Sequence, residues 1–469
     1  MLAHNLLDAA LLSLDKADWQ QLHQWLNSPL HHSHAPSLEL FHWMADYFSA
    51  HHELPPTDLQ PPSWAQKGLS RLQFRKYRSL LLESVENFLA WKVWRSREEQ
   101  RANDLLEAYR LRGCSQNLAK RLKRDRKRFK QYELWNSDHL SAGYVREELG
   151  LIVDNITERR NTTTFEAAEQ RLLRWQTAER MRKAVATLAR SQTSGIPIEM
   201  PLFDAYLNQI ESSPELLEEP AISLYYHACR LYRPDHTNNK TDHFSALTQL
   251  LPKCLPGFTP TEQTALLKLT INFMIRRINT DPNTEILQTA LDLYQLGLDK
   301  KLLLEEGHLS VFTFNNFVSI ALKLHLSHTV ETFIDQNAHL LSPQRKSETL
   351  AFNRARLLYA QGKPDQALLQ LQSIDYQDPL DLLNARMLQI RIYYEAGEDQ
   401  ALYDLLRATR ALLRRRQIGY HQENFRNNLR MVQKLLRLEW HSKKAVEKFR
   451  QQVIEMKPLS EKEWLLGRL

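Results

Sequence analysis

Apolar residues along this chain recur at helical spacing rather than in strict alternation. In the first half, one run of apolar residues is separated by three or four positions at a time: Tyr77, Leu81, Val85, Phe88, Trp91 and Trp94. Residues spaced in this way lie along one face of an α-helix. The pattern predicts a long helix over residues 72–112, and Gly113 is a suitable residue to end it.

The second half has a different rhythm, in which shorter apolar stripes follow one another in pairs. Residues 262–278 pair with 284–296, and residues 314–325 pair with 330–341. Because a single pair of short helices cannot bury its apolar side, neighbouring pairs must stack against one another. The pattern therefore favours an array of antiparallel helix pairs.

One unit of this array matches the tetratricopeptide pattern, a repeat of about 34 residues. The pattern requires small or medium apolar residues at fixed positions, a glycine in the turn and a proline near the end. The chain supplies Ala355, Leu358, Gly362, Ala367, Leu371, Ile374 and Pro379, and the following residues match less exactly at Leu388, Ile392, Gly397, Ala401, Leu405 and Ala408. An ordinary helical hairpin is the alternative interpretation.

The segment 191–201, SQTSGIPIEMP, has the composition of a linker. We place a boundary there, which gives two regions. Residues 1–190 form an N-terminal helical region with a basic helix near 115–135. Residues 202–469 form a tetratricopeptide-like repeat array.

Composition agrees with an all-α protein. Together with the repeat pattern, it predicts a tetratricopeptide-like α-solenoid of antiparallel helix pairs preceded by a helical region. Hydrophobic residues make up 43% of the 469 residues, which is enough to build a core, and there are only 12 glycines. A shortage of glycine argues against the phosphate-binding loops that rely on it. The sequence contains no GxSxG nucleophile motif, no P-loop and no GxGxxG dinucleotide-binding motif. We therefore expect neither an enzyme nor a bound cofactor.

Positive charge is concentrated in one window. The formal net charge is +7, and residues 119–132 contain eight cations and one acid, so this window equals the whole excess. Leu111, Leu118, Leu122, Phe129 and Tyr132 form a narrow apolar stripe through it.

This basic helix has two interpretations. It is either a solvated helix surface or a binding site for nucleic acid or another polyanion. The residues of this candidate anion patch are Lys120, Arg121, Lys123, Arg124, Arg126, Lys127, Arg128 and Lys130.

Other chemistry is sparse. The three cysteines, Cys114, Cys229 and Cys254, are far apart in sequence, and the histidine clusters at 31–34 and 51–52 lack the spacing of a metal site. We expect no metal. The N-terminus lacks the features of a signal peptide, and residues 309–322 are too short and polar to span a bilayer. The sequence predicts a cytoplasmic protein that is not inserted in a membrane.

Several stretches together resemble a family of uncharacterised, TPR-like helical proteins from Bacteroidota-type bacteria. They are residues 272–279 (NFMIRRIN), 309–316 (LSVFTFNN), 351–379, 385–397 and 412–416 (LLRRR), with a looser match at 26–29 (LNSP). The resemblance implies a helical-repeat fold and a bacterial cytosolic setting. It implies no catalytic residue, because the family carries no established activity.

The repeat pattern without a catalytic motif predicts a non-catalytic scaffold for protein–protein interaction, with a protein partner whose identity the sequence does not give. On the tetratricopeptide template, the concave side is lined by the first helix of each pair. The candidate peptide-groove residues are Phe352, Arg356, Tyr359, Arg386, Ile390 and Tyr393. The alternatives are polyanion binding through residues 119–132 and an enzyme on a helical scaffold, which would need a deep polar pocket.

Overall fold

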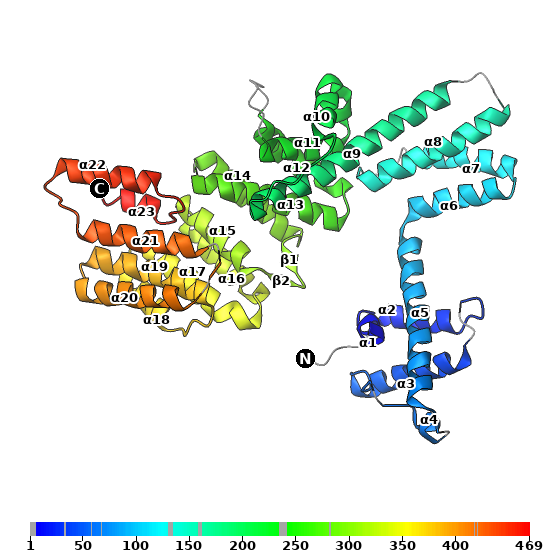
Figure 1. Ribbon diagram of the computed structural model, residues 1–469, viewed down its shortest axis with the longest axis horizontal. Coiled ribbons are helices and arrows are strands. Elements are labelled where there is room, and N and C mark those ends of the chain that lie inside the picture. Colours follow the sequence, from blue (N-terminus) through cyan, green and yellow to red (C-terminus); the bar gives the residue numbers. More distant parts are fainter. Residues whose placement is uncertain are drawn as a thin grey trace. The chain divides into compact units, whose positions relative to one another are not determined.

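The computed structural model confirms an all-helical protein (Figure 1). It describes residues 6–31, 34–57, 59–66, 68–129, 135–157, 162–233, 242–280, 283–416, 418–419 and 421–469. Within these residues, extended structure is limited to two short antiparallel strands, β1 (Leu304–Glu305) and β2 (His308–Leu309).

The chain divides into two compact units. Unit 1 comprises residues 1–132 and 137–175, and unit 2 comprises residues 133–136 and 176–469. The division falls inside a single continuous helix, α9 (Thr163–Ser194), so it precedes the predicted linker at 191–201. Residues 195–200 have no regular helix or strand, whereas residues 191–194 are the last residues of α9.

Unit 1 is built on one long helix, α5, against which α1, α2 and α3 pack. Ser70 starts α5 with a reciprocal cap, in which its hydroxyl accepts from the Gln73 amide while the Gln73 side chain accepts from Ser70. The helices of this unit are α1 (Leu6–Leu12), α2 (Lys16–Leu26), α3 (Ala35–His51), α4 (Pro62–Gln66), α5 (Arg71–Ser96), α6 (Glu98–Leu111), α7 (Ser115–Phe129), α8 (Ser137–Thr157) and the first part of α9.

The predicted stripe of α5 is partly confirmed. Leu81, Val85 and Phe88 are fully buried, whereas Trp94 is 44% exposed. The single helix predicted over 72–112 is wrong, because the backbone leaves the helical conformation at Arg97 and α6 starts afresh. The break lets α6 pack on α7 and α8, around the buried residues Leu106, Leu118, Leu122 and Leu149.

Unit 2 continues with consecutive helices. Proline occupies the first turn of several of them, where its fixed φ suits a helix start and its missing N–H is not needed. The elements are α10 (Phe203–Ser212), α11 (Pro220–Tyr232), α12 (His243–Cys254), α13 (Pro260–Thr280), α14 (Thr284–Asp299), α15 (Val311–Lys323), α16 (Ser327–Asn337), α17 (Pro343–Ala360), α18 (Pro364–Gln372), α19 (Pro379–Ala396), α20 (Asp399–Arg415), α21 (His421–Leu436), α22 (Lys443–Glu455) and α23 (Lys462–Leu466), with 3₁₀ turns at Pro214–Glu218, Leu255–Gly257 and Ala338–Leu340.

Helices α15, α17 and α19 contact each other in succession, and each also packs against the helix that follows it. Gly362 has φ of 74° in the turn between α17 and α18, where a side chain would be strained. One core forms around this turn from residues that the repeat pattern selected, among them Ala355, Ala367, Leu371, Leu388 and Ile392.

The second copy of the pattern is displaced by one residue. In α20 the buried positions are Leu402, Leu406 and Thr409, whereas Ala401 and Leu405 are only half-buried. The reason is that Gly397, which ends α19 with φ of 72°, stands one residue later than the repeat pattern requires. The buried positions of α20 are therefore shifted by one residue as well.

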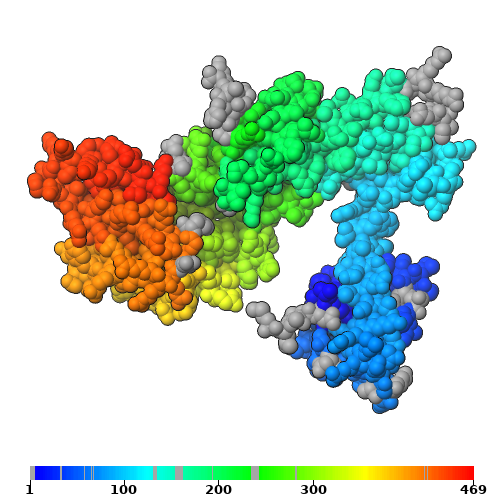
Figure 2. Space-filling model, viewed as in Figure 1, coloured from blue at the N-terminus to red at the C-terminus, as the bar shows by residue number. Residues whose placement is uncertain are grey.

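The C-terminal helices share one core. Residues of α19, α20, α21, α22 and α23 contribute to it, including Ile390, Leu406, Leu429, Val453 and Leu465. Figure 2 shows this part as a continuous orange-to-red body. In the described part of the chain, no helix combines the length and the apolar character that crossing a bilayer requires.

Candidate functional site

The predicted peptide-groove residues lie on α17 and α19, and several of them are engaged inside the molecule. Arg356 donates hydrogen bonds to the backbone oxygen of Asn315, at 3.2 Å, and to the hydroxyl of Ser319, both on α15. Burial lowers the pKa of Arg356 to about 10, with a further contribution from the neighbouring Arg391. Arg356 therefore stabilises packing between helices rather than projecting into solvent.

The other groove residues follow the same trend. Ile390 is fully buried in the C-terminal core, so its assignment to a binding surface is corrected. Tyr393 accepts a hydrogen bond from Gln372 at 3.3 Å. Phe352 and Arg386 are half-buried, and burial lowers the pKa of Arg386.

Helix α23 packs against the α15–α19 side of unit 2. The Trp464 indole N–H donates to Glu395 of α19 at 2.8 Å, and Lys323 of α15 donates to Glu463 at 2.6 Å. Tyr359, a predicted groove residue, also donates to Glu395, at 2.8 Å. The face on which a partner peptide was predicted to bind is therefore partly occupied by a segment of the chain itself.

In the predicted anion patch on α7, part of the charge is paired. Arg121 donates to Asp125 at 2.7 Å, Arg126 donates to Glu147 at 2.6 Å, and Arg128 pairs with Glu98. This pairing reduces the positive field that a distant polyanion would meet.

The rest of this patch is exposed. Lys120, Lys123 and Lys127 have no ion pair within the residues that the structure describes, and Arg124 lies 3.9 Å from Asp125. Lys130 lies outside the described residues. The apolar stripe is confirmed at Leu118, Leu122 and Phe129, whereas Leu111 is exposed and Tyr132 is also outside the described residues.

A second basic region lies near the C-terminus, and the sequence analysis missed it. Residues 401–450 contain thirteen Lys and Arg but only four Asp and Glu. Acidic residues elsewhere in the chain cancel the positive charge of residues 401–450 in the total. For this reason the charge of window 119–132 equals the net charge of the chain, although a second basic segment exists. A count of charge along the whole chain would have found both.

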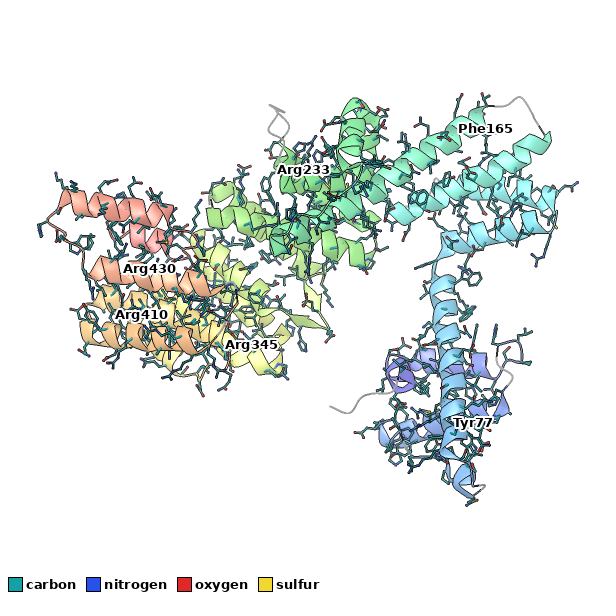
Figure 3. All side chains as sticks on the ribbon, in the orientation of Figure 1. Tyr77, Phe165, Arg233, Arg345, Arg410 and Arg430 are labelled. Carbon is teal, nitrogen blue, oxygen red and sulfur yellow. The ribbon has the colours of Figure 1, made fainter. Side chains whose placement is uncertain are left out.

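The fold gathers part of this charge on one surface, formed by α20, α21 and α22. On α21 the apolar residues at 425, 429, 432 and 435 enter the core, which turns the cations at 426, 430 and 434 outward. Arg437 is exposed in the turn that follows this helix. We define the C-terminal basic surface as Arg410, Arg414, Arg430, Lys434, Arg437 and Lys448. Figure 3 labels Arg410 and Arg430 on neighbouring helices.

The charges of this surface are not neutralised locally. None of its six cations has an acidic ion-pair partner among residues whose placement is described, whereas nearby Arg407 and Arg450 pair with Asp404 and Glu447. The pKa of Arg410 is lowered, first by burial and then by Arg414 and Arg437. Arg410 of α20 and Arg437, which directly follows α21, therefore act on each other electrostatically.

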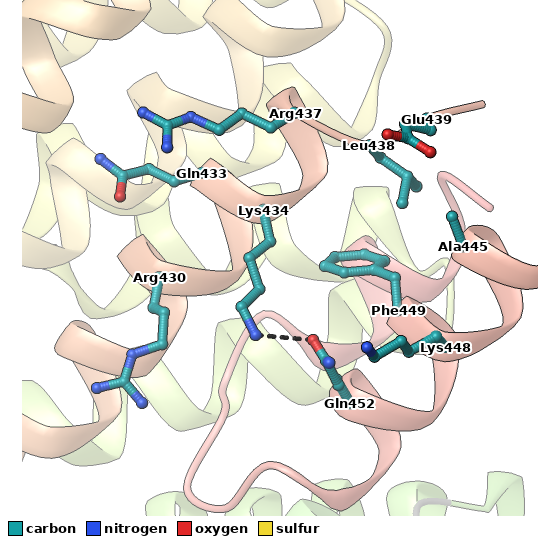
Figure 4. Close-up of a pocket in the computed structure, with 10 residues that line it drawn as sticks. All are labelled: Arg430, Gln433, Lys434, Arg437, Leu438, Glu439, Ala445, Lys448, Phe449 and Gln452. Carbon is teal, nitrogen blue, oxygen red and sulfur yellow. Dashed lines mark hydrogen bonds between the residues drawn. The ribbon is translucent and has the colours of Figure 1, made fainter. Parts of the chain in front are cut away.

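A pocket of about 380 Å³ lies between α21 and α22 (Figure 4). Arg430 and Lys434 line it from α21, Arg437 lines it from the turn that follows α21, and Lys448 lines it from α22. The Lys434 ammonium donates to the Gln452 side-chain oxygen at 2.7 Å. Glu439 is the one carboxylate among the lining residues that the structure describes, and four cations line the same pocket.

Histidine does not form a metal centre in the described part of the chain, where no group of three or more potential ligands is found. His31 stacks on Trp25, and His34 caps the start of α3 by accepting from the Ser37 amide. His227 and His243 approach each other at 2.9 Å between their Nδ1 atoms.

No family model, curated protein or solved structure matches the chain.

Proposed function

We propose that this chain is a non-catalytic helical-repeat scaffold that binds nucleic acid on its C-terminal basic surface. The carrying observation is the set of six cations on three adjoining helices that lack acidic partners among the described residues. Phosphate groups spaced along a strand are the ligand that such a surface suits.

The scaffold part of the proposal is a tetratricopeptide-like arrangement. It is supported by the successive packing of α15, α17 and α19, by the turn glycines Gly362 and Gly397, and by the small buried residues Ala355 and Ala367. In such an array the binding surface is extended and shallow, which suits a polymer better than a small substrate.

Nucleic acid is favoured over an acidic protein by what the surface lacks. Protein interfaces have an apolar centre with few lysines, whereas nucleic-acid interfaces are polar and strongly positive. Around the pocket, the large apolar residue Phe449 is 3% exposed, and the accessible residues are mainly Arg, Lys and Gln. The groove on α17 and α19, which would serve a peptide, is partly covered by α23.

The test is an electrophoretic shift of the full chain with duplex DNA over a series of salt concentrations. About five phosphate contacts predict a slope of about −4 to −5 in the log–log plot of affinity against salt. Replacing Arg430→Gln and Arg437→Gln together should make this slope shallower by about 2.

The matched control is Lys253→Gln with Lys346→Gln, which removes two exposed cations elsewhere in unit 2 and should leave the slope unchanged. Polyglutamate serves as the acidic polypeptide competitor. The proposal fails if DNA does not bind at low salt, if both double variants behave alike, or if polyglutamate competes at lower concentration than DNA.

A further inference from the structure

A second cationic pocket lies within unit 1, independent of the surface described above. It has a volume of about 480 Å³ and is lined by the end of α7, by α8 and by the start of α9. Figure 3 labels Phe165, which is in the first turn of α9.

Four cations from three helices converge on this pocket: Arg126 and Lys127 from α7, Arg146 from α8 and Arg171 from α9. Among the described residues that line it, Glu147 is the one carboxylate, and it already accepts from Arg126 at 2.6 Å. The lining therefore keeps a formal excess of positive charge. Because these residues are far apart in sequence, only the folded unit brings their charges together.

The ring of Phe129 fixes two of these cations in place. The guanidinium carbons of Arg146 and Arg171 lie 4.5 Å and 5.3 Å from the ring centre. The ring stacks on His139 at 4.0 Å, and a Cβ atom at Gly143 would lie 2.7 Å from it. Glycine at 143 thus allows the ring to sit directly on α8.

Arg146 is the most deeply placed of the four cations, with a side chain that is 5% exposed. Its Nη2 atom lies 3.7 Å from Glu99. Cations that converge on one pocket repel one another, and an anion bound among them would offset that repulsion.

We propose that this pocket binds a small ligand through a phosphate group. Guanidinium groups match phosphate oxygens with paired N–H donors, and a dianion balances several cations better than a single carboxylate does. Thr163 and Thr164 also line the pocket, and their hydroxyls are suited to phosphate oxygens. The proposal concerns unit 1 and does not depend on nucleic-acid binding by unit 2.

The test is isothermal titration of the full chain with pyrophosphate, inorganic phosphate and citrate, each at constant ionic strength. We expect pyrophosphate to bind with one site per chain and more tightly than citrate. The double variant Lys127→Gln with Arg171→Gln should weaken pyrophosphate binding by about tenfold or more, since two charge-assisted contacts are lost. Arg171→Lys keeps the positive charge but loses the paired N–H donors of the guanidinium. Its affinity for pyrophosphate should lie between those of the wild type and the double variant.

Two controls separate this site from the others. Lys120→Gln with Lys123→Gln removes exposed cations of α7 that do not line the pocket, and Arg430→Gln with Arg437→Gln removes cations of unit 2. Both should bind pyrophosphate like the wild type, and far-ultraviolet circular dichroism should be equal for all variants. Absent binding, equal binding by the pocket variant, or citrate binding as tight as pyrophosphate would overturn the proposal.

Discussion

At the scale of single residues, the contact between His227 of α11 and His243 of α12 ties the stability of unit 2 to pH. Burial, followed by the proximity of His243, lowers the pKa of His227 to about 4. The pKa of His243 is also lowered, by burial and then by Arg230. Asp242 acts on His243 in the opposite direction. Tyr226 packs against both rings, and Glu211 pairs with Arg230. The two Nδ1 atoms, 2.9 Å apart, can form a hydrogen bond only while at least one of the imidazoles is neutral and can accept it.

This arrangement predicts acid sensitivity that His227→Gln reduces. Between pH 6.5 and about 4, the unfolded chain binds a proton at His227 that the folded chain does not, so stability falls as the pH falls through this window. The expected loss is about 3 kcal/mol at pH 4. Thermal unfolding followed from pH 7 to pH 4 measures it.

The matched control is His328→Gln, at an exposed position of α16. This variant should keep the acid sensitivity of the wild type. A pH profile of His227→Gln that parallels both would contradict the assignment.

At the scale of an element, glycine has opposite roles in different helices. Gly362 and Gly397 end helices with positive φ, and the sequence pattern identified both as turn residues. Gly297 lies inside α14, where it allows Leu267 and Leu303 to pack against the helix backbone. A Cβ atom there would lie 2.6 Å from Leu267 and 2.7 Å from Leu303. Helical propensity alone would favour alanine at this position, so packing has overruled it.

Gly297→Ala should destabilise unit 2 by about 1–2 kcal/mol. The gain of about 1 kcal/mol in helix propensity is outweighed by overpacking against two buried leucines. The midpoint of urea unfolding measures the change. Gly467→Ala is the control, because its Cβ would meet nothing closer than 3.4 Å, and that midpoint should not fall. A Gly297→Ala midpoint equal to or above the wild type would refute the packing argument.

Local apolar spacing predicts some helices of this chain well, and it does not predict the break between α5 and α6. Apolar spacing predicted α13, α14, α15 and α16 to within a few residues, because each carries a clear buried stripe. It joined α5 and α6, since both contain helix-forming residues and no proline or glycine marks Arg97. The same spacing could not tell whether Arg356 or Ile390 would face a partner or a neighbouring helix.

At the scale of the whole molecule, contacts distant in sequence hold the last helix in place. Trp464 is 7% exposed, packs edge-on against Tyr394 at 5.4 Å, and donates to Glu395. Arg391 of α19 pairs with Glu461 at 3.3 Å. These contacts join residues about 70 positions apart, so α23 fastens the side of unit 2 that includes α19.

Trp464→Ala should loosen this side of unit 2 without affecting unit 1. Removal of a buried indole costs about 3–5 kcal/mol. Hydrogen exchange followed by mass spectrometry should therefore show faster exchange in α19 and α23 and unchanged exchange in α3 and α5. Trp440→Ala, at a position 51% exposed, is the control and should leave exchange in α19 as it was. Equal protection of α19 in both variants would contradict this role of α23.

By itself, the sequence determined that the chain is helical and that it carries a strongly basic segment. It also determined the position of the turn at Gly362. These properties depend on local spacing and on composition. Only the tertiary structure decided which charges remain available. It paired Arg121, Arg126 and Arg128 with carboxylates. It turned Arg430 and Arg437 outward, with no such partner in the part of the chain that the structure describes. Ion pairing and burial depend on residues that are distant in sequence, so no local pattern contains them.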